Sequence, residues 1–231
     1  MKKNKNSKVA WQSPTIQLIV SGLSNSTNRK TGNMVQSYIL RRDVSPIEAL
    51  ATNKDRSICG DCPLRGTTIN GKRTGRPCYV NVGQGPQSLW KAQSNFAGKE
   101  SSISGRTFRM GTYGDPAFVP VSVWHKLLAN VIGWTGYTHQ WRKATSQGLK
   151  TLVMASCESI ESKDQANALG WRTFRVMRKN ESLQTDEVLC PASEEAGKRT
   201  TCENCQLCSG NTIKAKNVAI YAHSSNKVNL K

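Results

Sequence analysis

Residues 107–141 have the sequence TFRMGTYGDPAFVPVSVWHKLLANVIGWTGYTHQW, and this stretch decides the fold. It begins with the β-prone run TFRM and ends with a second β-prone segment, GYTHQW. Between them, after Pro120, apolar side chains recur at the helical period: Val123, Trp124, Leu127, Leu128 and Val131. We therefore expect a helix from about residue 121 to residue 132, joining two parallel strands, because parallel neighbours need a crossover between them.

The same alternation of β-prone runs and helix-compatible segments continues on both sides of this unit. The β-prone runs lie at residues 78–83, 107–114, 136–141, 151–157, 171–177 and 217–223. Repeated strand–crossover units predict an α/β protein with a mostly parallel sheet. Such a sheet either remains open or curves into a partial or complete β/α barrel-like body.

The chain divides into three regions by composition. Residues 1–50 form a basic N-terminal arm and the segment that leads into the body, residues 51–180 form the barrel-like body, and residues 181–231 form a cysteine-rich tail with a final strand. The first twelve residues contain lysines and no acid, and their low hydrophobicity predicts a disordered arm.

The charge of the chain indicates its partner. Thirty-three Lys and Arg against 15 Asp and Glu give a formal net charge of +18, which attracts polyanions. We expect a nucleic acid, DNA rather than RNA, as the partner; the alternative is that the cationic surface serves solubility or a membrane surface. No basic amphipathic helix, export signal or membrane-length apolar run is visible, so the sequence predicts a cytoplasmic protein without a membrane partner.

The eight cysteines fall into two groups, which we interpret as two metal sites. They are Cys59, Cys62, Cys78 and Cys157 in the body, and Cys190, Cys202, Cys205 and Cys208 in the tail. The tail spacing C-P-x10-C-x2-C-x2-C is typical of one ferredoxin-type iron–sulfur cluster, and zinc bound by four thiolates is the alternative. In the first group Cys157 is either the fourth ligand or a buried core thiol.

Polar residues follow the β-prone runs, and the carboxyl ends of parallel strands meet at one edge of a sheet. The candidate catalytic residues are His139, Asp115 and Glu158, and the candidate substrate-binding residues are Arg109, Tyr113, Tyr137, Gln140, Trp141 and Arg175. An imidazole or carboxylate would move a proton, an arginine would hold an anionic group, and aromatic rings would stack a base. Asp115 has a second interpretation as an Asx-type turn residue. No P-loop, dinucleotide fingerprint or Ser-His-Asp order is present.

A group of short motifs carries a resemblance to a known family. The motifs are Cys59-x2-Cys62, Cys78-Tyr79, Gly114-Asp115-Pro116, the GYTHQW run and the cysteine-rich tail. Over roughly residues 55–210 the chain resembles small, phage-encoded, cysteine-rich proteins related to radical-SAM barrels. The resemblance implies a barrel-like body with an iron–sulfur cluster, S-adenosylmethionine as cofactor, and a role in nucleotide or nucleic-acid modification in the host cytoplasm. Radical-SAM enzymes usually carry a compact C-x3-C-x2-C, whereas fifteen residues separate Cys62 from Cys78 here.

Two functions follow from these features. The first is a transferase-like metalloenzyme that modifies a nucleic acid or a nucleotide. The second is a non-catalytic zinc-binding protein that binds DNA or assists replication. An enzyme requires Arg109, Asp115 and His139 to converge on one pocket, whereas a binding module requires a continuous basic groove.

Overall fold

The computed structural model describes residues 3–70 and 72–223, with the side chains of residues 72 and 73 left out. None of the helices in this part of the chain has the length and apolar character needed to cross a membrane. Lys2, which we assigned to the basic arm, lies outside the described residues.

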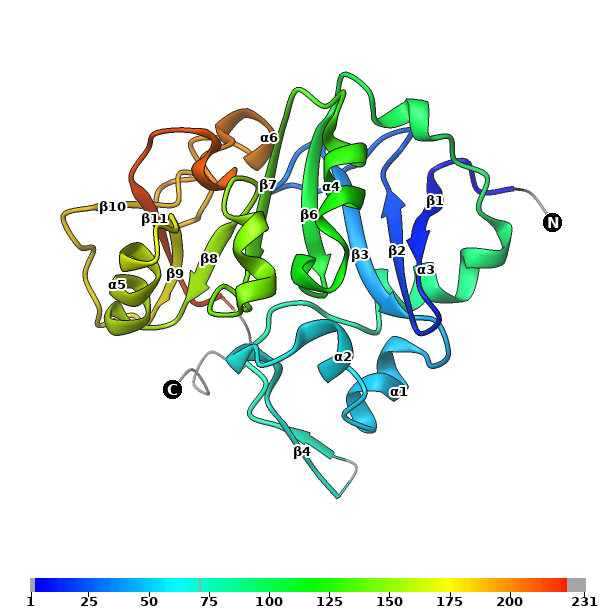
Figure 1. The fold of residues 1–231 in the computed structure, drawn as a ribbon, viewed down its shortest axis with the longest axis horizontal. Coiled ribbons are helices and arrows are strands. Elements are labelled where there is room, and N and C mark those ends of the chain that lie inside the picture. Colours follow the sequence, from blue (N-terminus) through cyan, green and yellow to red (C-terminus); the bar gives the residue numbers. More distant parts are fainter. Residues whose placement is uncertain (1–2, 71, 224–231) are drawn as a thin grey trace.

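Nine strands form one large, mixed sheet (Figure 1). In spatial order the strands are β1 (Ser7–Gln12), β2 (Ile16–Ser21), β3 (Val35–Arg41), β6 (Thr107–Tyr113), β7 (Gly133–Thr138), β8 (Met154–Cys157), β9 (Thr173–Met177), β11 (Asn217–Tyr221) and β10 (Glu187–Leu189). The pairs from β3 to β10 are parallel, and β1, β2 and β3 are antiparallel. The prediction of a mostly parallel α/β sheet is confirmed. The sheet is open, with β1 and β10 at its edges, so the prediction of a complete barrel is wrong.

Short helices and one small hairpin occupy the connections. The helices are α1 (Pro46–Ala51), α2 (Arg56–Cys59), α3 (Gly85–Ala92), α4 (Val121–Leu128), α5 (Ile160–Ala168) and α6 (Cys202–Cys205). The single 3-10 turns are η1 (Pro63–Arg65), η2 (Gln93–Asn95), η3 (Glu100–Ile103), η4 (Pro116–Phe118), η5 (Ala144–Leu149) and η6 (Gly210–Thr212). The hairpin pairs β4 (Thr67–Ile69) with β5 (Lys72–Thr74) and projects from the body (Figure 1).

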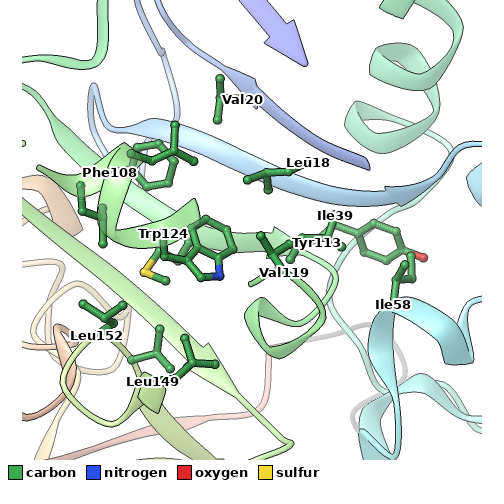
Figure 2. Packing of buried hydrophobic residues seen from close by; sticks show 14 of the residues in the cluster. Leu18, Val20, Ile39, Ile58, Phe108, Tyr113, Val119, Trp124, Leu149 and Leu152 are labelled. Atoms are coloured by element: carbon green, nitrogen blue, oxygen red, sulfur yellow. The ribbon is translucent and has the colours of Figure 1, made fainter. Parts of the chain in front are cut away.

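Helix α4 covers one face of the sheet, as its apolar stripe predicts. Trp124 is fully buried, its ring meets Phe108 of β6 edge-on at 6.5 Å between centroids, and its indole N–H donates to the Pro116 carbonyl at 3.0 Å. Figure 2 shows this packing together with Leu149 and Leu152. The helix ends at Leu128, four residues before the predicted end, because the chain turns there and enters β7 at Gly133.

Helix α5 covers the same face farther along the sheet. It begins with a capping box in which the Ser159 hydroxyl accepts from the Ser162 N–H and the Ser162 hydroxyl accepts from the Ser159 N–H. Ala166 of this helix lies in the same apolar core as Trp124 and Cys157. Alternation along the strands then leaves Arg109, Thr135, Ser156 and Phe174 on the other face.

Three segments differ from the sequence-based expectation. Residues 7–12 are not a disordered arm: they form the edge strand β1, where Lys8 pairs with Glu100 at 2.8 Å. Residues 78–83 are β-prone in composition but form a loop, since Cys78 donates its N–H to the Leu64 carbonyl rather than to a strand. The segment GYTHQW is a strand only to Thr138, so His139 begins the loop that follows.

Candidate active site and its two thiol groups

A cavity of about 970 Å³ lies on the face of the sheet opposite α4 and α5. Its floor is built from inward-facing residues of β6, β7, β8 and β9: Arg109, Gly111, Thr135, Tyr137, Ser156, Phe174 and Val176. Both cysteine groups border it, apart from Cys157. A volume of this size accommodates a nucleotide-sized ligand.

The two thiol groups lie at opposite ends of the parallel strands. Cys59 ends α2, and the neighbouring Ile58 carbonyl accepts from the Asp115 N–H at 2.7 Å, just beyond the carboxyl end of β6. In the tail, Cys202 donates its N–H to the Lys30 carbonyl before β3, and the Cys208 carbonyl accepts from Gly136 within β7. Figure 1 shows α2 and α6 at opposite ends of β6 and β7. The first group therefore lies at the edge where parallel sheets place their chemistry.

The first group is held by a tight turn against the end of β7. Gly60 adopts a positive φ of 57°, and a Cβ atom there would lie 2.5 Å from the Gln140 side chain. That side chain donates to the Cys59 carbonyl at 3.2 Å, and Cys62 donates its N–H to the same carbonyl at 3.2 Å. Only glycine allows this close approach without displacing its neighbour. The turn therefore packs the Cys59–Cys62 loop against the segment that carries His139.

His139 is fixed at both its backbone and its ring. Its N–H donates to Asp115 Oδ2 at 2.8 Å, and its Nε2 lies 2.6 Å from Glu158 Oε1. Burial lowers the pKa of the imidazole, but the neighbouring Cys62 sulfur and the Glu158 carboxylate outweigh it and raise the pKa well above its usual value. The His139 ring therefore lies between the Glu158 carboxylate and the Cys62 sulfur of the first thiol group.

Asp115 serves mainly to position its neighbours. Oδ1 accepts from the Ala117 N–H at 2.9 Å and from the Thr138 hydroxyl at 2.7 Å, and Oδ2 accepts from His139. Burial raises the pKa of this carboxyl group, although the three hydrogen bonds oppose the rise. The Asx-type interpretation therefore accounts for its contacts, while the residue also borders the cavity.

The fourth cysteine of the predicted first group lies elsewhere. Cys157 is fully buried in the apolar core behind β8, and Ser156 is the β8 residue that faces the cavity. Burial, with the nearby Glu158 charge, raises the pKa of Cys157 to about 12. The structure thus separates Cys157 from Cys59, Cys62 and Cys78 and favours the core-thiol alternative.

The tail group is surrounded by apolar side chains. Cys190, Cys202 and Cys208 are buried with Met34, Met154, Val218 and Ile220. Burial, and beyond it the charges that Cys190, Cys202 and Cys205 would carry, raise the pKa of Cys208 to about 12, although Tyr137 lowers it. Cys190, Cys202 and Cys208 therefore belong to one apolar cluster. Yet nowhere in residues 3–70 and 72–223 are three or more Cys, His, Asp or Glu side chains already placed to hold a metal ion.

Arg109 is the main charged group inside the cavity. It is 8% exposed; its Nη2 donates to the Tyr79 hydroxyl at 2.8 Å, and its guanidinium lies 5.7 Å from the centroid of the Tyr137 ring. Within the described residues no carboxylate pairs with it. Two other lining residues, Thr135 and Tyr113, have buried hydroxyls that find no hydrogen-bond partner in this part of the chain. Because both hydroxyls border the cavity, they are free to form hydrogen bonds with a group bound there.

Several predicted substrate-binding residues do not reach the cavity. Arg175 points to the opposite face, where it forms a bidentate pair with Glu187, with both distances at 2.7 Å. Trp141 is buried and donates its indole N–H to the Ser156 carbonyl, and Gln140 braces the Cys59 turn. Glu158 contacts His139 but is not a lining residue. Arg109, Tyr113, Tyr137, Asp115 and His139 do border one cavity.

Sequence reasoning missed Tyr79 and Arg76 as site residues. Tyr79 is 61% exposed, borders the cavity, and accepts a hydrogen bond from Arg109 through its hydroxyl. Arg76 donates to the Cys78 carbonyl at 3.2 Å, and its Nε is buried without a partner among the described residues. Their position beside Cys78 is the signal that could have identified them, because a ligand-bearing loop must fold over its site.

Comparison with known proteins gives no assignment: no family model, curated protein or solved structure matches the chain significantly.

Proposed function

We propose that this chain is a metalloenzyme that modifies a nucleic acid or a nucleotide-like substrate bound in the cavity between its two thiol groups. The observation that carries the proposal is Arg109, a buried guanidinium without a carboxylate partner in the described residues, at the floor of a cavity of about 970 Å³. A buried charge is costly unless it is paired, so an anionic ligand group is the natural partner.

The lining aromatic residues fit the rest of such a substrate. Tyr137 and Phe174 contact each other in the cavity floor, with 4.3 Å between ring centroids and the ring planes tilted by 40°, and Arg109 lies beside Tyr137. A phosphate on Arg109 would leave the attached base within reach of these rings, which is how proteins hold an extruded base. The net charge of +18 supports a nucleic-acid source for that base.

The strand order supports a partial barrel as the scaffold. From β3 through β6, β7, β8 and β9, successive parallel strands are also spatial neighbours, as in sheets that curve toward a barrel. Cys59, Cys62 and Cys78 border the carboxyl-end side of the cavity, and three thiolates suit either zinc or an iron–sulfur cluster. Such a centre would supply Lewis-acid chemistry, or an electron when it is a cluster that acts with S-adenosylmethionine.

The chain's own residues would bind and orient the substrate and move protons. Arg109 would hold the anionic group, and its hydrogen bond to Tyr79 would close the mouth of the cavity. The His139–Glu158 pair would hold or transfer a proton at the carboxyl-end side. The tail group, buried among apolar side chains, would stabilise the other end of the cavity.

Calorimetry with deoxynucleoside monophosphates and the matching nucleosides tests the proposal. We expect the monophosphates to bind more tightly, and Arg109→Met to weaken their binding about 10- to 100-fold, because a charge-assisted hydrogen bond is lost. Nucleoside binding should change little. The matched control is Arg178→Met, since Arg178 is exposed and is not a lining residue of the cavity.

Two results would contradict the proposal. One is equal affinity for nucleosides and monophosphates in the wild-type protein. The other is equal losses in Arg109→Met and Arg178→Met, which would place the anion on the surface and favour a DNA-binding module. Catalysis itself is tested by incubating the protein anaerobically with DNA, S-adenosylmethionine and a reductant. The DNA is then digested to nucleosides, and mass spectrometry shows whether any nucleoside has changed in mass.

A further inference from the structure

The first thiol group has three cysteines at the cavity and lacks the fourth that its sequence suggests. Cys59, Cys62 and Cys78 border the cavity, whereas Cys157 is fully buried behind β8 in the apolar core. Bringing Cys157 to the cavity would require β8 to exchange its two faces, because successive strand residues point to opposite sides. A fourth ligand must therefore come from another element.

His139 is placed where that ligand is needed. It borders the same cavity directly after β7, and its backbone is tied to the thiol turn by two links. Asp115 accepts from the His139 N–H at 2.8 Å and donates its own N–H to the Ile58 carbonyl at 2.7 Å. Gln140, the next residue, donates to the Cys59 carbonyl. The thiol turn and the imidazole are thus parts of one hydrogen-bonded unit.

Glu158 prepares the imidazole for coordination. Its Oε1 lies 2.6 Å from His139 Nε2, which leaves Nδ1 as the nitrogen available to a metal. Metal-binding histidines typically give their second ring nitrogen to a carboxylate, which fixes the ring and raises its basicity. Glu158 has that role here without bordering the cavity itself.

Arg76 provides a second, independent indication. Its Nε is buried without a partner among the described residues, although its Nη1 donates to the Cys78 carbonyl at 3.2 Å. Three thiolates and one neutral imidazole around a divalent ion carry a net charge of −1. The half-buried Arg76 guanidinium, whose Nε is enclosed beside Cys78, would balance that charge.

We propose that Cys59, Cys62, Cys78 and His139 bind one zinc ion, with Glu158 as the residue that orients His139 and with Cys157 excluded. The inference rests on the proposed function but revises two of its parts: it selects zinc over a cluster, and it makes His139 a ligand rather than a proton carrier. A zinc ion with four protein ligands has no open position, so this centre would stabilise the carboxyl-end side of the cavity. Three thiolates and one imidazole are a common tetrahedral zinc set. Because no three of these side chains are yet arranged around one point, binding requires the thiol side chains to turn toward His139.

Zinc stoichiometry of anaerobically purified full-length protein tests the ligand set. With both groups loaded we expect two zinc equivalents per chain in the wild type and in Cys157→Ser, and one in His139→Ala. His139→Cys should restore the second equivalent, since a thiolate can replace the imidazole, whereas a purely structural histidine would not be rescued. Cys205→Ser is the reference for loss of the tail equivalent alone. Glu158→Gln should keep two equivalents but release one about 10- to 100-fold more readily to a competing chelator.

Retention of two equivalents by His139→Ala, or loss of one by Cys157→Ser, would overturn the inference. So would iron and sulfide in place of zinc at the first group. Circular dichroism of each variant checks folding, and the His139→Cys rescue keeps the test decisive if His139→Ala is poorly folded. Zinc content is measured without substrate, so its outcome is separate from the calorimetry of monophosphates. A negative result for zinc binding does not contradict monophosphate binding at Arg109, and the reverse also holds.

Discussion

Two buried arginines on opposite faces of the sheet have different surroundings. Arg175 of β9 faces the side covered by α5, where Glu187 binds it at two positions and the Ser182 carbonyl accepts a further hydrogen bond. Arg109 of β6 faces the cavity, where it donates to the Tyr79 hydroxyl and lies beside the Tyr137 ring, and no carboxylate in the described residues pairs with it. The buried charge on the covered face is paired with a carboxylate, although Arg175 Nη1 has no hydrogen-bond partner in the described residues. The buried charge on the cavity face has no carboxylate partner in the same residues.

The cysteines repeat the same contrast. Cys157, the register partner of Arg175, is enclosed in the apolar core, while Cys59, Cys62 and Cys78 border the cavity near His139. Residue type alone therefore does not mark a functional group in this protein. What distinguishes these residues is the face of the sheet on which they lie: one face packs into the core, and the other borders the cavity.

The largest expected effect is on the covered face. Glu187→Gln should lower the free energy of unfolding by about 3–5 kcal/mol, because it leaves the Arg175 charge buried with too little compensation. Urea denaturation measures the change. The matched control is Glu194→Gln, whose solvent-exposed pair with Lys198 should contribute far less to the free energy of unfolding. If Glu187→Gln lowers the free energy of unfolding as little as Glu194→Gln does, Arg175 does not depend on its carboxylate partner and the contrast with Arg109 fails.

On the cavity face, replacing the buried arginine should not lower the free energy of unfolding substantially. Arg109→Met removes a buried charge that has no carboxylate partner in the described residues, so the free energy of unfolding should change by less than about 1 kcal/mol or rise. The same denaturation experiment measures it in the absence of ligand. A loss as large as that of Glu187→Gln would mean that Arg109 is a structural residue.

The smallest effect is expected at Cys157. With its pKa raised to about 12, only about one Cys157 thiol in ten thousand is a thiolate at pH 8, and the side chain is also inaccessible. In metal-free native protein, iodoacetamide at pH 8 should label Cys62 and leave Cys157 unmodified until urea is added. Peptide mass spectrometry identifies the sites. Since the thiolate forms only as pH rises toward the pKa, raising pH from 7 to 9 should not expose Cys157, and early labelling there would contradict its placement.

Sequence periodicity was sufficient for strands β6 to β9, for β11 and for helix α4, whereas β2 and β3 were not predicted. The apolar runs around Phe108 and Trp124 keep their local preference because they pack against each other. The run at residues 78–83 loses its β preference since it has no neighbouring strand to pair with and is held instead by the Leu64 carbonyl. Strand β1 was missed because Lys8 within it, together with Lys3 and Lys5 just before it, gave the segment the composition of a disordered arm; lysine is tolerated on an edge strand.

The candidate site was predicted only as far as strand ends could be located. Arg109 and His139 follow from their place on or after strands, but Arg175 was assigned to the pocket because sequence does not reveal which face of β9 it occupies. A one-residue change of register exchanges the two faces of a strand. For the same reason Cys157 was grouped with the other thiols, and the role of His139 beside Cys62 became visible only from the fold.

The most direct test of this account is a crystal structure of the anaerobically purified, metal-loaded protein with an anomalous difference map recorded at the metal's absorption edge. The account predicts one peak among Cys59, Cys62, Cys78 and His139 and a second among the four tail cysteines, on either side of the cavity. A peak bonded to Cys157, or no peak at the carboxyl ends of β6 and β7, would contradict it.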